Sequence, residues 1–507
     1  MAQKFNFNDL FILDLANNHQ GNVEHGLHII RSVAAIVRSH QVRAALKFQF
    51  RQLDTFIHPK HQEGSDHKQV RRFLSTRLDR DQFQILLEEV RAQGMVTMCT
   101  PFDEASVAVI EAMGFDVIKV ASCSGKDWPL LEKVAEAGKP VVSSTGGLTN
   151  RDIDNLVSFF QHRGVHFAIM HCVAIYPTPD GNLNLHQIGS LRERYGAALP
   201  IGWSTHENPD DTAPVQLAVA QGAELFERHV GVATEQIKLN AYSSTPEQIS
   251  KWLEAHKRAK VLCGAKARPP VADAEREATE ELRRGVYAKR RLRKGAEIER
   301  EQVYFAIPYL DGQLDSGSFK PGTACTEDLA AHAPVLEAQV ELPDQKDALT
   351  IKHAVHEVKA ILNQGKIHLG PEFRIEYSHH RGISRFRETG AVIIECINRE
   401  YCKKLVVQLP GQSHPSHYHI KKEETFQVLH GTLHCLVAGF HRELGPGESV
   451  VVLPGVWHSF WTDGGVIFEE ISTKHYNDDS FYEDKAINKL ARSERKTVVD
   501  HWGRFQI

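Results

Sequence analysis

Eight short apolar runs alternate with longer amphipathic runs over the first half of this 507-residue chain. The apolar runs are candidate strands at 11–16, 44–50, 95–101, 117–122, 140–144, 167–172, 200–206 and 225–230. The other runs have helical spacing, at 23–39, 81–93, 104–113, 129–138, 151–162, 211–221 and 246–264. Strands that alternate with helices predict crossover units in a parallel sheet. Eight such units in about 260 residues favour a closed (β/α)8 barrel.

The alternative is an open doubly wound sheet, which would carry a glycine-rich turn after its first strand. The sequence there reads Asn17-Asn18-His19-Gln20-Gly21, with a single glycine. We therefore predict an α/β protein whose first domain, residues 1–264, is a TIM barrel.

The second half of the chain has a different pattern. Residues 265–282 are polar and contain Pro269-Pro270, so we expect a linker. Residues 283–345 hold three short strand patterns with turn glycines (285–289, 292–298 and 302–306), which indicate a small β-rich domain. Within 346–507, a helical run at 351–364 precedes strand patterns near 392–397, 404–408, 425–429, 433–438, 449–453 and 466–471. Short strands at this spacing predict a β-sandwich or β-barrel.

Charge and composition exclude several classes of protein. The net charge of −4, from 60 basic and 64 acidic side chains, excludes a strongly basic surface for nucleic acid. No apolar run approaches the ~20 residues of a membrane-spanning helix, and Met1–Asn6 opens no apolar signal segment. Eight cysteines without a C-x-x-C pair suggest reduced thiols. We therefore expect a cytoplasmic protein with no membrane partner.

Polar side chains stand at the C-terminal ends of the candidate strands, where the active site of such a barrel forms. Lys47 and Lys119 lie inside apolar strands, where a lysine is costly to bury without an anion. Hydroxyl groups lie at or near the ends of four strand patterns, one of which also carries Lys119: Thr100, Ser122, Ser144 and Ser204. Lysine charges and hydroxyl donors together suit a phosphate. The alternative for either lysine by itself is a strand-edge position or a carboxylate partner.

Two histidines end neighbouring strands. His206 follows the seventh strand pattern and His229 the eighth. Either one alone is more often a packed residue, but the pair at matching strand ends predicts a shared divalent metal.

Eight of the 29 histidines fall between residues 414 and 475. Three of them belong to the pattern G-x5-H-x-H-x4-E-x6-G, which starts at Gly411, and G-x7-G-x2-H, which starts at Gly447. His417 and His419 share one face of a strand, and Glu424 and His458 complete a mixed N/O site for Mn, Fe, Ni or Zn. The pattern is that of a cupin; the alternative is a cupin that no longer uses the metal. We expect the other five histidines (414, 430, 434, 441 and 475) on the surface or in loops.

The barrel half resembles the sialic acid synthase family. The matching runs are Asp14-Leu-Ala-Asn-Asn-His-Gln-Gly, Leu46-Lys-Phe-Gln, Thr100-Pro-Phe-Asp, Ile118-Lys-Val-Ala-Ser, Ser144-Thr-Gly-Gly, His171-Cys-Val-Ala-Ile-Tyr-Pro-Thr-Pro, Ile201-Gly-Trp-Ser-Thr-His and Glu227-Arg-His. The resemblance implies condensation of phosphoenolpyruvate with an open-chain N-acylated hexosamine, giving a nonulosonic acid and phosphate. Residues 283–345 resemble the antifreeze-like (SAF) domain, which in that family caps the barrel of the other chain in a homodimer.

The resemblance also implies roles for individual residues. Phosphoenolpyruvate would be held by Lys47, Thr100, Lys119, Ser122, Ser144 and Ser204. The divalent metal, commonly manganese, would be bound by His206 and His229. Gln49 and Tyr176 would lie near the sugar, and Asp14 takes the place of a catalytic glutamate.

Two positions depart from the family pattern. Asn240 stands where the last aspartate of a sugar-contacting stretch is usual, and Ile307 stands where an arginine reaches the partner's sugar pocket. Both departures concern the sugar, whereas the phosphoenolpyruvate residues persist. The hypothesis is therefore an acceptor other than N-acetylmannosamine.

The C-terminal domain resembles the D-lyxose isomerase group of cupins in the run from Leu444 to Trp461. The resemblance implies aldose–ketose exchange on a metal, with Lys422, Glu469 or Glu470 moving the proton. A bifunctional enzyme is therefore one alternative. A domain that only binds sugar or supports an oligomer is another. The whole chain could instead be a non-catalytic sugar-binding or regulatory protein, against which the retained lysines and histidines of the barrel argue.

Overall fold

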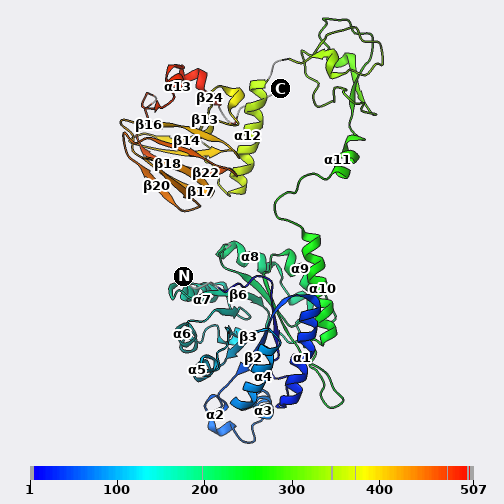
Figure 1. Cartoon of the computed structure of the whole chain (residues 1–507), viewed down its shortest axis with the longest axis vertical. Helices are drawn as coiled ribbons and strands as arrows, with labels where there is room; N and C mark the ends of the chain where they lie inside the picture. Colours follow the sequence, from blue (N-terminus) through cyan, green and yellow to red (C-terminus); the bar gives the residue numbers. More distant parts are fainter. Residues whose placement is uncertain are drawn as a thin grey trace. The chain divides into compact units, whose positions relative to one another are not determined.

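The computed structural model describes residues 5–196, 198–343, 346–371, 373–476, 478–499 and 502. The chain divides into two compact units, Met1–Pro269 and Pro270–Ile507 (Figure 1). Two predictions fall on residues outside the described ones. Residues 1–4 belong to the N-terminal segment in which no signal pattern was found, and residue 345 is a predicted domain boundary.

The first unit contains a closed barrel of eight parallel strands, which confirms the predicted fold class. The strands are β1 (Leu10–Asp14), β2 (Arg43–Phe50), β3 (Val96–Pro101), β4 (Val117–Val120), β5 (Val141–Ser144), β6 (Phe167–Cys172), β7 (Ile201–Thr205) and β8 (Leu225–His229). Each lies within two residues of its predicted bounds. The largest differences are at β1 and β4, which each end two residues earlier than predicted; Ser122 begins a 3-10 turn after β4.

Helices surround the barrel. They are α1 (Val23–His40), α4 (Arg80–Ala92), α5 (Glu104–Met113), α6 (Trp128–Glu136), α7 (Asn150–His162), α8 (His186–Tyr195), α9 (Ala213–Ala220) and α10 (Pro246–Cys263). Two short helices, α2 (Leu53–Phe56) and α3 (Lys68–Ser75), lie on an insertion after β2. The sequence did not reveal α8, because only Ile188 and Leu191 of its ten residues are buried, too few for a clear helical period.

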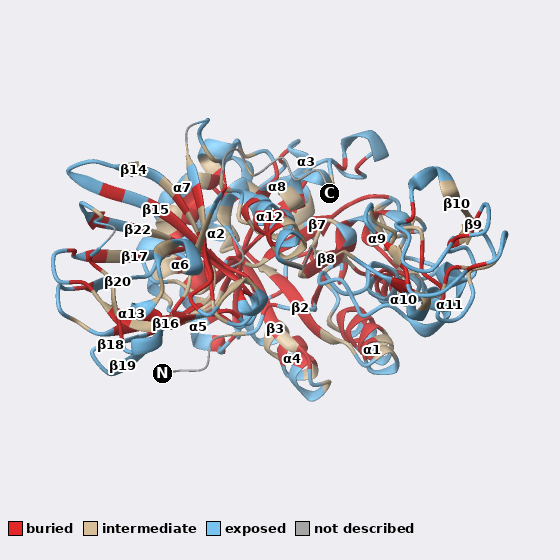
Figure 2. Ribbon diagram, turned by 90° about the horizontal axis from the view of Figure 1, so that it is seen from above, coloured by how far each residue is buried: buried red, intermediate tan, exposed pale blue. Residues whose placement is uncertain are grey.

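Alternation along the strands separates two environments. On β2, Ala44, Leu46 and Phe48 pack in the cluster between strands and helices, whereas Ala45 packs inside the barrel. Lys47 and Gln49 share the inward face with Ala45, nearer the C-terminal end. Apolar side chains therefore fill one end of the interior, and polar ones gather at the other. The strands β2, β7 and β8 are drawn as buried in Figure 2.

The predicted linker contains a helix, α11 (Asp273–Glu280), none of whose residues is buried. Beyond it, β9 (Gly285–Ala288) pairs with β10 (Val303–Ala306), and β11 (Ala324–Cys325) with β12 (Val340–Glu341). The strand predicted at 292–298 is wrong: this segment turns at Gly295, whose φ is +78°, and forms only isolated bridges. A separate core, including Val286, Val303 and Leu314, fills this part.

The C-terminal region is β-rich, as predicted. After α12 (Lys346–Gln364), seven strands form one sheet in the order β20 (Ser449–Val452), β17 (Glu424–Gly431), β22 (Val466–Thr473), β15 (Tyr401–Gln408), β14 (Ala391–Asn398), β13 (Arg374–Ser378) and β24 (Lys496–Val499). Five form a second sheet in the order β19 (Phe440–Leu444), β18 (Leu433–Val437), β21 (His458–Trp461), β16 (Ser413–Tyr418) and β23 (Phe481–Tyr482). Two short helices, α13 (Lys485–Lys489) and α14 (Arg492–Arg495), precede β24. The strand expected for His417 and His419 is β16, which ends at Tyr418, so His419 lies just after it. Five strands had no clear sequence pattern: β13, β19, β21, β23 and β24.

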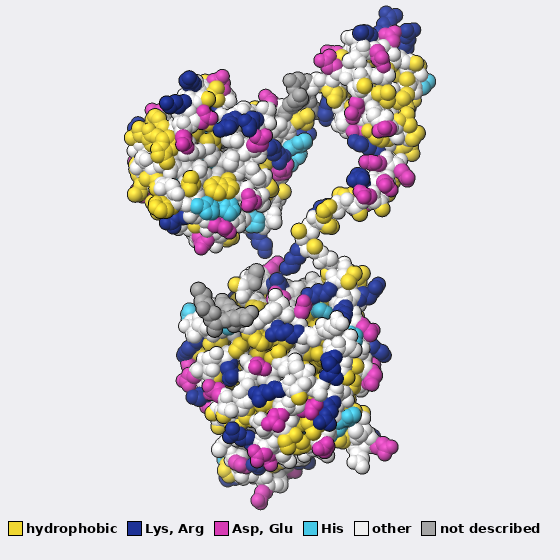
Figure 3. Space-filling model, viewed as in Figure 1, with side chains coloured by type: hydrophobic (Ala, Val, Ile, Leu, Met, Phe, Trp, Pro, Cys, Tyr) yellow, Lys and Arg dark blue, Asp and Glu magenta, His cyan; other side chains and the backbone are white. Residues whose placement is uncertain are grey.

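The surface agrees with the balanced composition. On the face drawn in Figure 3, basic and acidic side chains are mixed over the described part of the barrel. No helix among the described residues is both long and apolar enough to cross a membrane.

Candidate functional site

A cavity of about 1050 Å³ opens at the C-terminal ends of the barrel strands. All twelve barrel residues singled out in the sequence line it: Asp14, Lys47, Gln49, Thr100, Lys119, Ser122, Ser144, Tyr176, Ser204, His206, His229 and Asn240. The parallel strands bring these positions together because all their C-terminal ends meet at the same end of the barrel.

Lys47 is a buried cation with a carboxylate partner. Its Nζ donates to Asp14 Oδ2 at 2.8 Å and to Thr100 Oγ1 at 3.4 Å. Gln49 Nε2 also donates to Asp14 Oδ2, at 3.2 Å. Burial raises the pKa of Asp14, but the charge and hydrogen bond of Lys47 outweigh this and lower it to about 2. At neutral pH the strand-one carboxylate is therefore ionised and holds the Lys47 ammonium in place.

Lys119 occupies the other side of the same interior. Its Nζ donates to Ser144 Oγ at 2.6 Å and lies 3.7 Å from Glu227 Oε2. Ser204 Oγ donates to Glu227 Oε1 at 2.9 Å. Each lysine thus has a carboxylate neighbour, which was the alternative considered for a buried lysine. Both lysines also line one cavity together with hydroxyl groups.

The two barrel histidines lie side by side, with ring centroids 5.3 Å apart. His206 Nδ1 donates to the carbonyl of Val173 at 3.1 Å, which leaves its Nε2 as a free acceptor. Burial lowers the pKa of His206 to about 3, so the imidazole is neutral, the form that binds metals. His229 Nδ1 is buried without a hydrogen bond and lies 3.4 Å from Asp14 Oδ2. Two neutral imidazoles beside a carboxylate fit a divalent cation.

The residues expected near the sugar surround these histidines. The ring centroid of Tyr176 lies 4.2 Å from that of His206, and the ring centroid of Tyr242 lies 5.2 Å from that of His229. Asn240 Oδ1 accepts from the backbone of Tyr242 and Ser243, so part of this side chain shapes its own loop. Ile307 is 58% exposed in the second unit.

Sequence reasoning missed two kinds of cavity residue. Glu227 lies two positions before His229 and therefore on the same face of β8, a signal that alternation could have supplied. Arg51, Lys68 and Arg72 come from the insertion after β2, where no periodic pattern pointed to the cavity.

The C-terminal region holds a second cluster. Ligand atoms of His417, His419 and His458 lie within 4.8 Å of one another, and all three residues are buried. Each Nδ1 donates to a backbone carbonyl, so each Nε2 is left as an acceptor. Glu424 Oε2 lies 3.2 Å from His458 Nε2, and neither atom has a hydrogen-bond partner. The donor set therefore fits the mixed metal site predicted from the sequence.

A buried charge network adjoins this cluster. Lys422 contacts Glu424, and its Nζ lies 3.0 Å from Glu470 Oε1, which also accepts from Lys404 at 3.0 Å. Burial raises the pKa of Glu470, but Lys404 and Lys422 outweigh it and lower the value to about 2. Glu469 points elsewhere and pairs with the partly exposed Lys403.

The expectation that His414 lies on the surface or in a loop is wrong. It is 7% exposed on β16, with its Nε2 2.9 Å from Nε2 of His380 and its ring stacked on Phe460. It lies on the strand that also carries His417, where a register shift between the two residues interrupts the alternation. None of His430, His434, His441 and His475 is fully buried.

Comparison with known proteins agrees with this arrangement. Residues 36–268 match the NeuB family, and residues 404–471 match the cupin domain. A solved structure from Chromobacterium violaceum, described as spore coat polysaccharide biosynthesis protein E, is 46% identical and covers 66% of this chain and 100% of its own, with a TM-score of 0.62. MJ1065 of Methanocaldococcus jannaschii is 29% identical over 57% of this chain and 82% of its own. N-acetylneuraminate-9-phosphate synthase of Drosophila melanogaster is 25% identical over 57% and 84%.

These matches confirm the resemblance to sialic acid synthases and the cupin pattern. Since the Chromobacterium relative is covered over its whole length, the chain belongs to the NeuB family and carries a cupin domain in its C-terminal region.

Proposed function

We propose that the barrel condenses phosphoenolpyruvate with an open-chain aldose to give a sialic-acid-like nonulosonic acid and phosphate. One observation supports this most: Lys47, Lys119, four hydroxyl groups and two neutral histidines line one cavity. The names of relatives such as N-acetylneuraminate-9-phosphate synthase support the same reaction class.

The residues suggest a division of labour. Lys47 and Lys119 hold the phosphate and carboxylate of phosphoenolpyruvate with fixed charges, which need not reorganise as charge develops. His206 and His229 would hold a divalent metal, which supplies Lewis-acid polarisation of the sugar aldehyde. C3 of phosphoenolpyruvate attacks that aldehyde carbon, water adds to the resulting cation at C2, and the hemiketal phosphate collapses with loss of phosphate.

The test is phosphate release from phosphoenolpyruvate by the full chain, with manganese and a panel of aldoses. The proposal is supported if phosphate release requires both the metal and an aldose. The product should then be longer than the aldose by the three carbons of phosphoenolpyruvate. The absence of release with every aldose, although phosphoenolpyruvate binds, contradicts it. A preference for N-acetylmannosamine would contradict only the hypothesis of another acceptor.

For the cupin domain we propose a metal site formed by His417, His419, Glu424 and His458. Lys422 and Glu470, buried beside it, are the candidate groups for proton transfer in aldose–ketose exchange, the activity of the isomerases that this domain resembles. Several expectations stay predictions. They are manganese or a similar metal in the barrel, Mn, Fe, Ni or Zn in the cupin, the SAF role of 283–345, the homodimer, the domain limits and the cytoplasmic location.

Replacing His417 and His419 by alanine should remove the metal of the cupin while phosphate release stays within about twofold of the unchanged chain. The reason is that the cupin ligands lie in the second compact unit, whose hydrophobic core shares no residue with that of the barrel. Metal content by atomic emission and phosphate release measure the two effects separately. Loss of phosphate release in a chain that keeps its fold would contradict independent sites.

A further inference from the structure

The C-terminal domain contains a cavity of about 110 Å³ that neither proposed site uses. Its walls include residues of β13, β14, β15 and β24 in the seven-stranded sheet. On these strands, Ile375 and Ile394 alternate with the lining residues and pack in the core that contains α12. The cavity therefore lies on the opposite face of the sheet. None of the four proposed metal ligands lines it.

Cationic side chains outnumber carboxylates in the lining of this cavity. Four cations line it against two carboxylates, which gives a surplus of two positive charges: Arg374, Lys404, Arg492 and Lys496 against Glu376 and Glu395. A buried positive charge is costly unless an anion pairs with it, so the partners of these cations decide whether the cavity is complete as it stands.

The buried lysines share their carboxylate partners with other cations. Glu376 accepts from Lys496 at 2.5 Å and from Arg492 at 2.6 Å. Glu470, next to the cavity, accepts from Lys404 at 3.0 Å and from a second lysine at the same distance. One carboxylate between two cations leaves part of the buried positive charge uncompensated.

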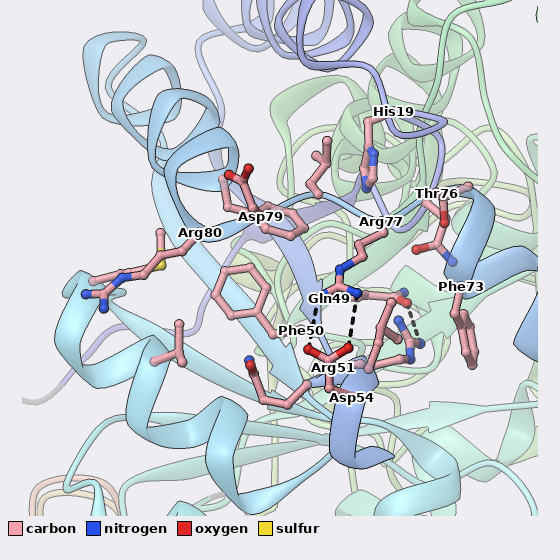
Figure 4. Close-up of a pocket in the computed structure, with 17 residues that line it drawn as sticks. His19, Gln49, Phe50, Arg51, Asp54, Phe73, Thr76, Arg77, Asp79 and Arg80 are labelled. Atoms are coloured by element: carbon pink, nitrogen blue, oxygen red, sulfur yellow. Dashed lines mark hydrogen bonds and ion pairs between the residues drawn. The ribbon is translucent and has the colours of Figure 1, made fainter. Parts of the chain in front are cut away.

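A pocket of about 250 Å³ between the insertion after β2 and the helices α4 and α5 shows the opposite case (Figure 4). There Arg77 donates to both carboxylate oxygens of Asp54 at 3.1 Å and so has a carboxylate of its own. The exposed arginine of the cupin cavity is Arg374, and no described residue forms an ion pair with it.

Two buried groups in the cavity lack full partners. Burial lowers the pKa of Lys496, and the charge of Glu376 opposes this only in part. His475 also lines the cavity, and its Nδ1 is buried without a hydrogen-bond partner among the described residues. An anion in the cavity would accept hydrogen bonds from both side chains and offset the cost of burying them.

We propose that this cavity binds a tetrahedral oxyanion, inorganic phosphate or the phosphate group of an ester, between Lys404, Lys496 and His475, with Arg374 at the opening. A phosphate group carries about two negative charges near neutral pH, which matches the surplus of the lining, whereas a carboxylate carries one. The volume suits such a group better than a whole sugar. The site is separate from the proposed condensation and does not depend on it.

The experiment titrates the full chain with inorganic phosphate by calorimetry. The barrel is expected to bind phosphate as well, so Lys119→Met serves as the background, because it removes a lysine of the barrel cavity and none of the cupin cavity. We expect one phosphate site to remain in this background. Adding Lys496→Met should weaken phosphate binding by roughly tenfold or more, and adding Arg374→Met by roughly threefold to tenfold, since each removes one charged partner.

The matched control is Lys403→Met. Lys403 precedes Lys404 on β15, pairs with Glu469 and does not line the cavity. It should leave the affinity for phosphate unchanged within about twofold. Thermal unfolding shows whether Lys496→Met keeps its fold. Because Arg374 is exposed, Arg374→Met tests the inference even where Lys496→Met does not fold.

Mannose 6-phosphate and mannose distinguish the two sources of the oxyanion. If the ester binds more tightly than inorganic phosphate and the variants weaken its binding, the cavity anchors a phosphorylated sugar. If the ester binds no more tightly, the free ion is the ligand. Binding of mannose should not respond to either variant. Three results would overturn the inference: no phosphate or ester bound by the background, equal affinities in the two test variants and the control, or an equal loss of mannose binding.

Discussion

Replacing Lys119 by methionine should lower kcat/KM for phosphate release by roughly a hundredfold to a thousandfold. Methionine keeps the unbranched stem of lysine and removes the ammonium group that bonds Ser144 and faces Glu227. The loss should be this large because Lys119 lies deep in the cavity wall and is only 2% exposed. A fixed charge in such a place has no replacement from solvent. Steady-state phosphate release with saturating metal measures the effect.

The control for this variant is Lys126→Met, which removes a lysine that is 61% exposed and pairs at 3.8 Å with Asp152. It should retain full activity. Thermal unfolding of both variants separates a catalytic loss from a folding defect, since Lys119→Met should unfold near the temperature of the unchanged chain. A folded Lys119→Met protein with more than a third of the original kcat/KM would exclude Lys119 from the phosphoenolpyruvate site.

The barrel and its strand ends could be predicted because they follow from local periodicity. Alternation along β2 places Lys47 and Gln49 on one face, and parallel strands bring equivalent ends together. The same rule located Ser144, Ser204 and His229 without any knowledge of their partners. Neighbours that depend on tertiary packing could not be found this way.

Arg51 and His414 illustrate that limit. Arg51 is held by Phe73 and Phe102, which are separated from it by 22 and 51 positions and follow no shared period. His414 is buried against His380, 34 residues away on another segment. Its strand is interrupted by a register shift between residues 414 and 417, which hides the alternation that would have marked it as buried.

A second large effect is expected at the ends of β7 and β8, where Glu207 and Arg228 form a buried ion pair. Their nearest atoms are 3.1 Å apart, and each side chain is 1% exposed. Both carboxylate oxygens of Glu207 and two nitrogens of Arg228 lack hydrogen-bond partners. Glu207→Gln should lower the free energy of unfolding by about 3–5 kcal/mol, because it leaves a buried guanidinium without its counter-charge.

The two partners should not be equivalent. Burial raises the pKa of Glu207 to about 7 despite the opposing charge of Arg228, so this carboxyl can accept a proton when its partner is lost. When Glu207 is replaced instead, Arg228 remains charged. We therefore expect Arg228→Met to cost less than Glu207→Gln, and the double variant Glu207→Met/Arg228→Met to recover most of the loss, since an apolar pair of similar volume replaces two underpaired charges.

Calorimetry of the full chain tests this order, with the surface pair variant Arg194→Met as the control, for which the cost should be at most about 1 kcal/mol. Glu207→Gln should lower the barrel transition by about 10 °C. Glu207 follows His206 and Arg228 precedes His229, so the same variant should also weaken manganese binding. If the double variant is no more stable than Glu207→Gln, the buried pair does not set the stability of these strand ends. If manganese binds all variants equally, the pair does not position the two histidines.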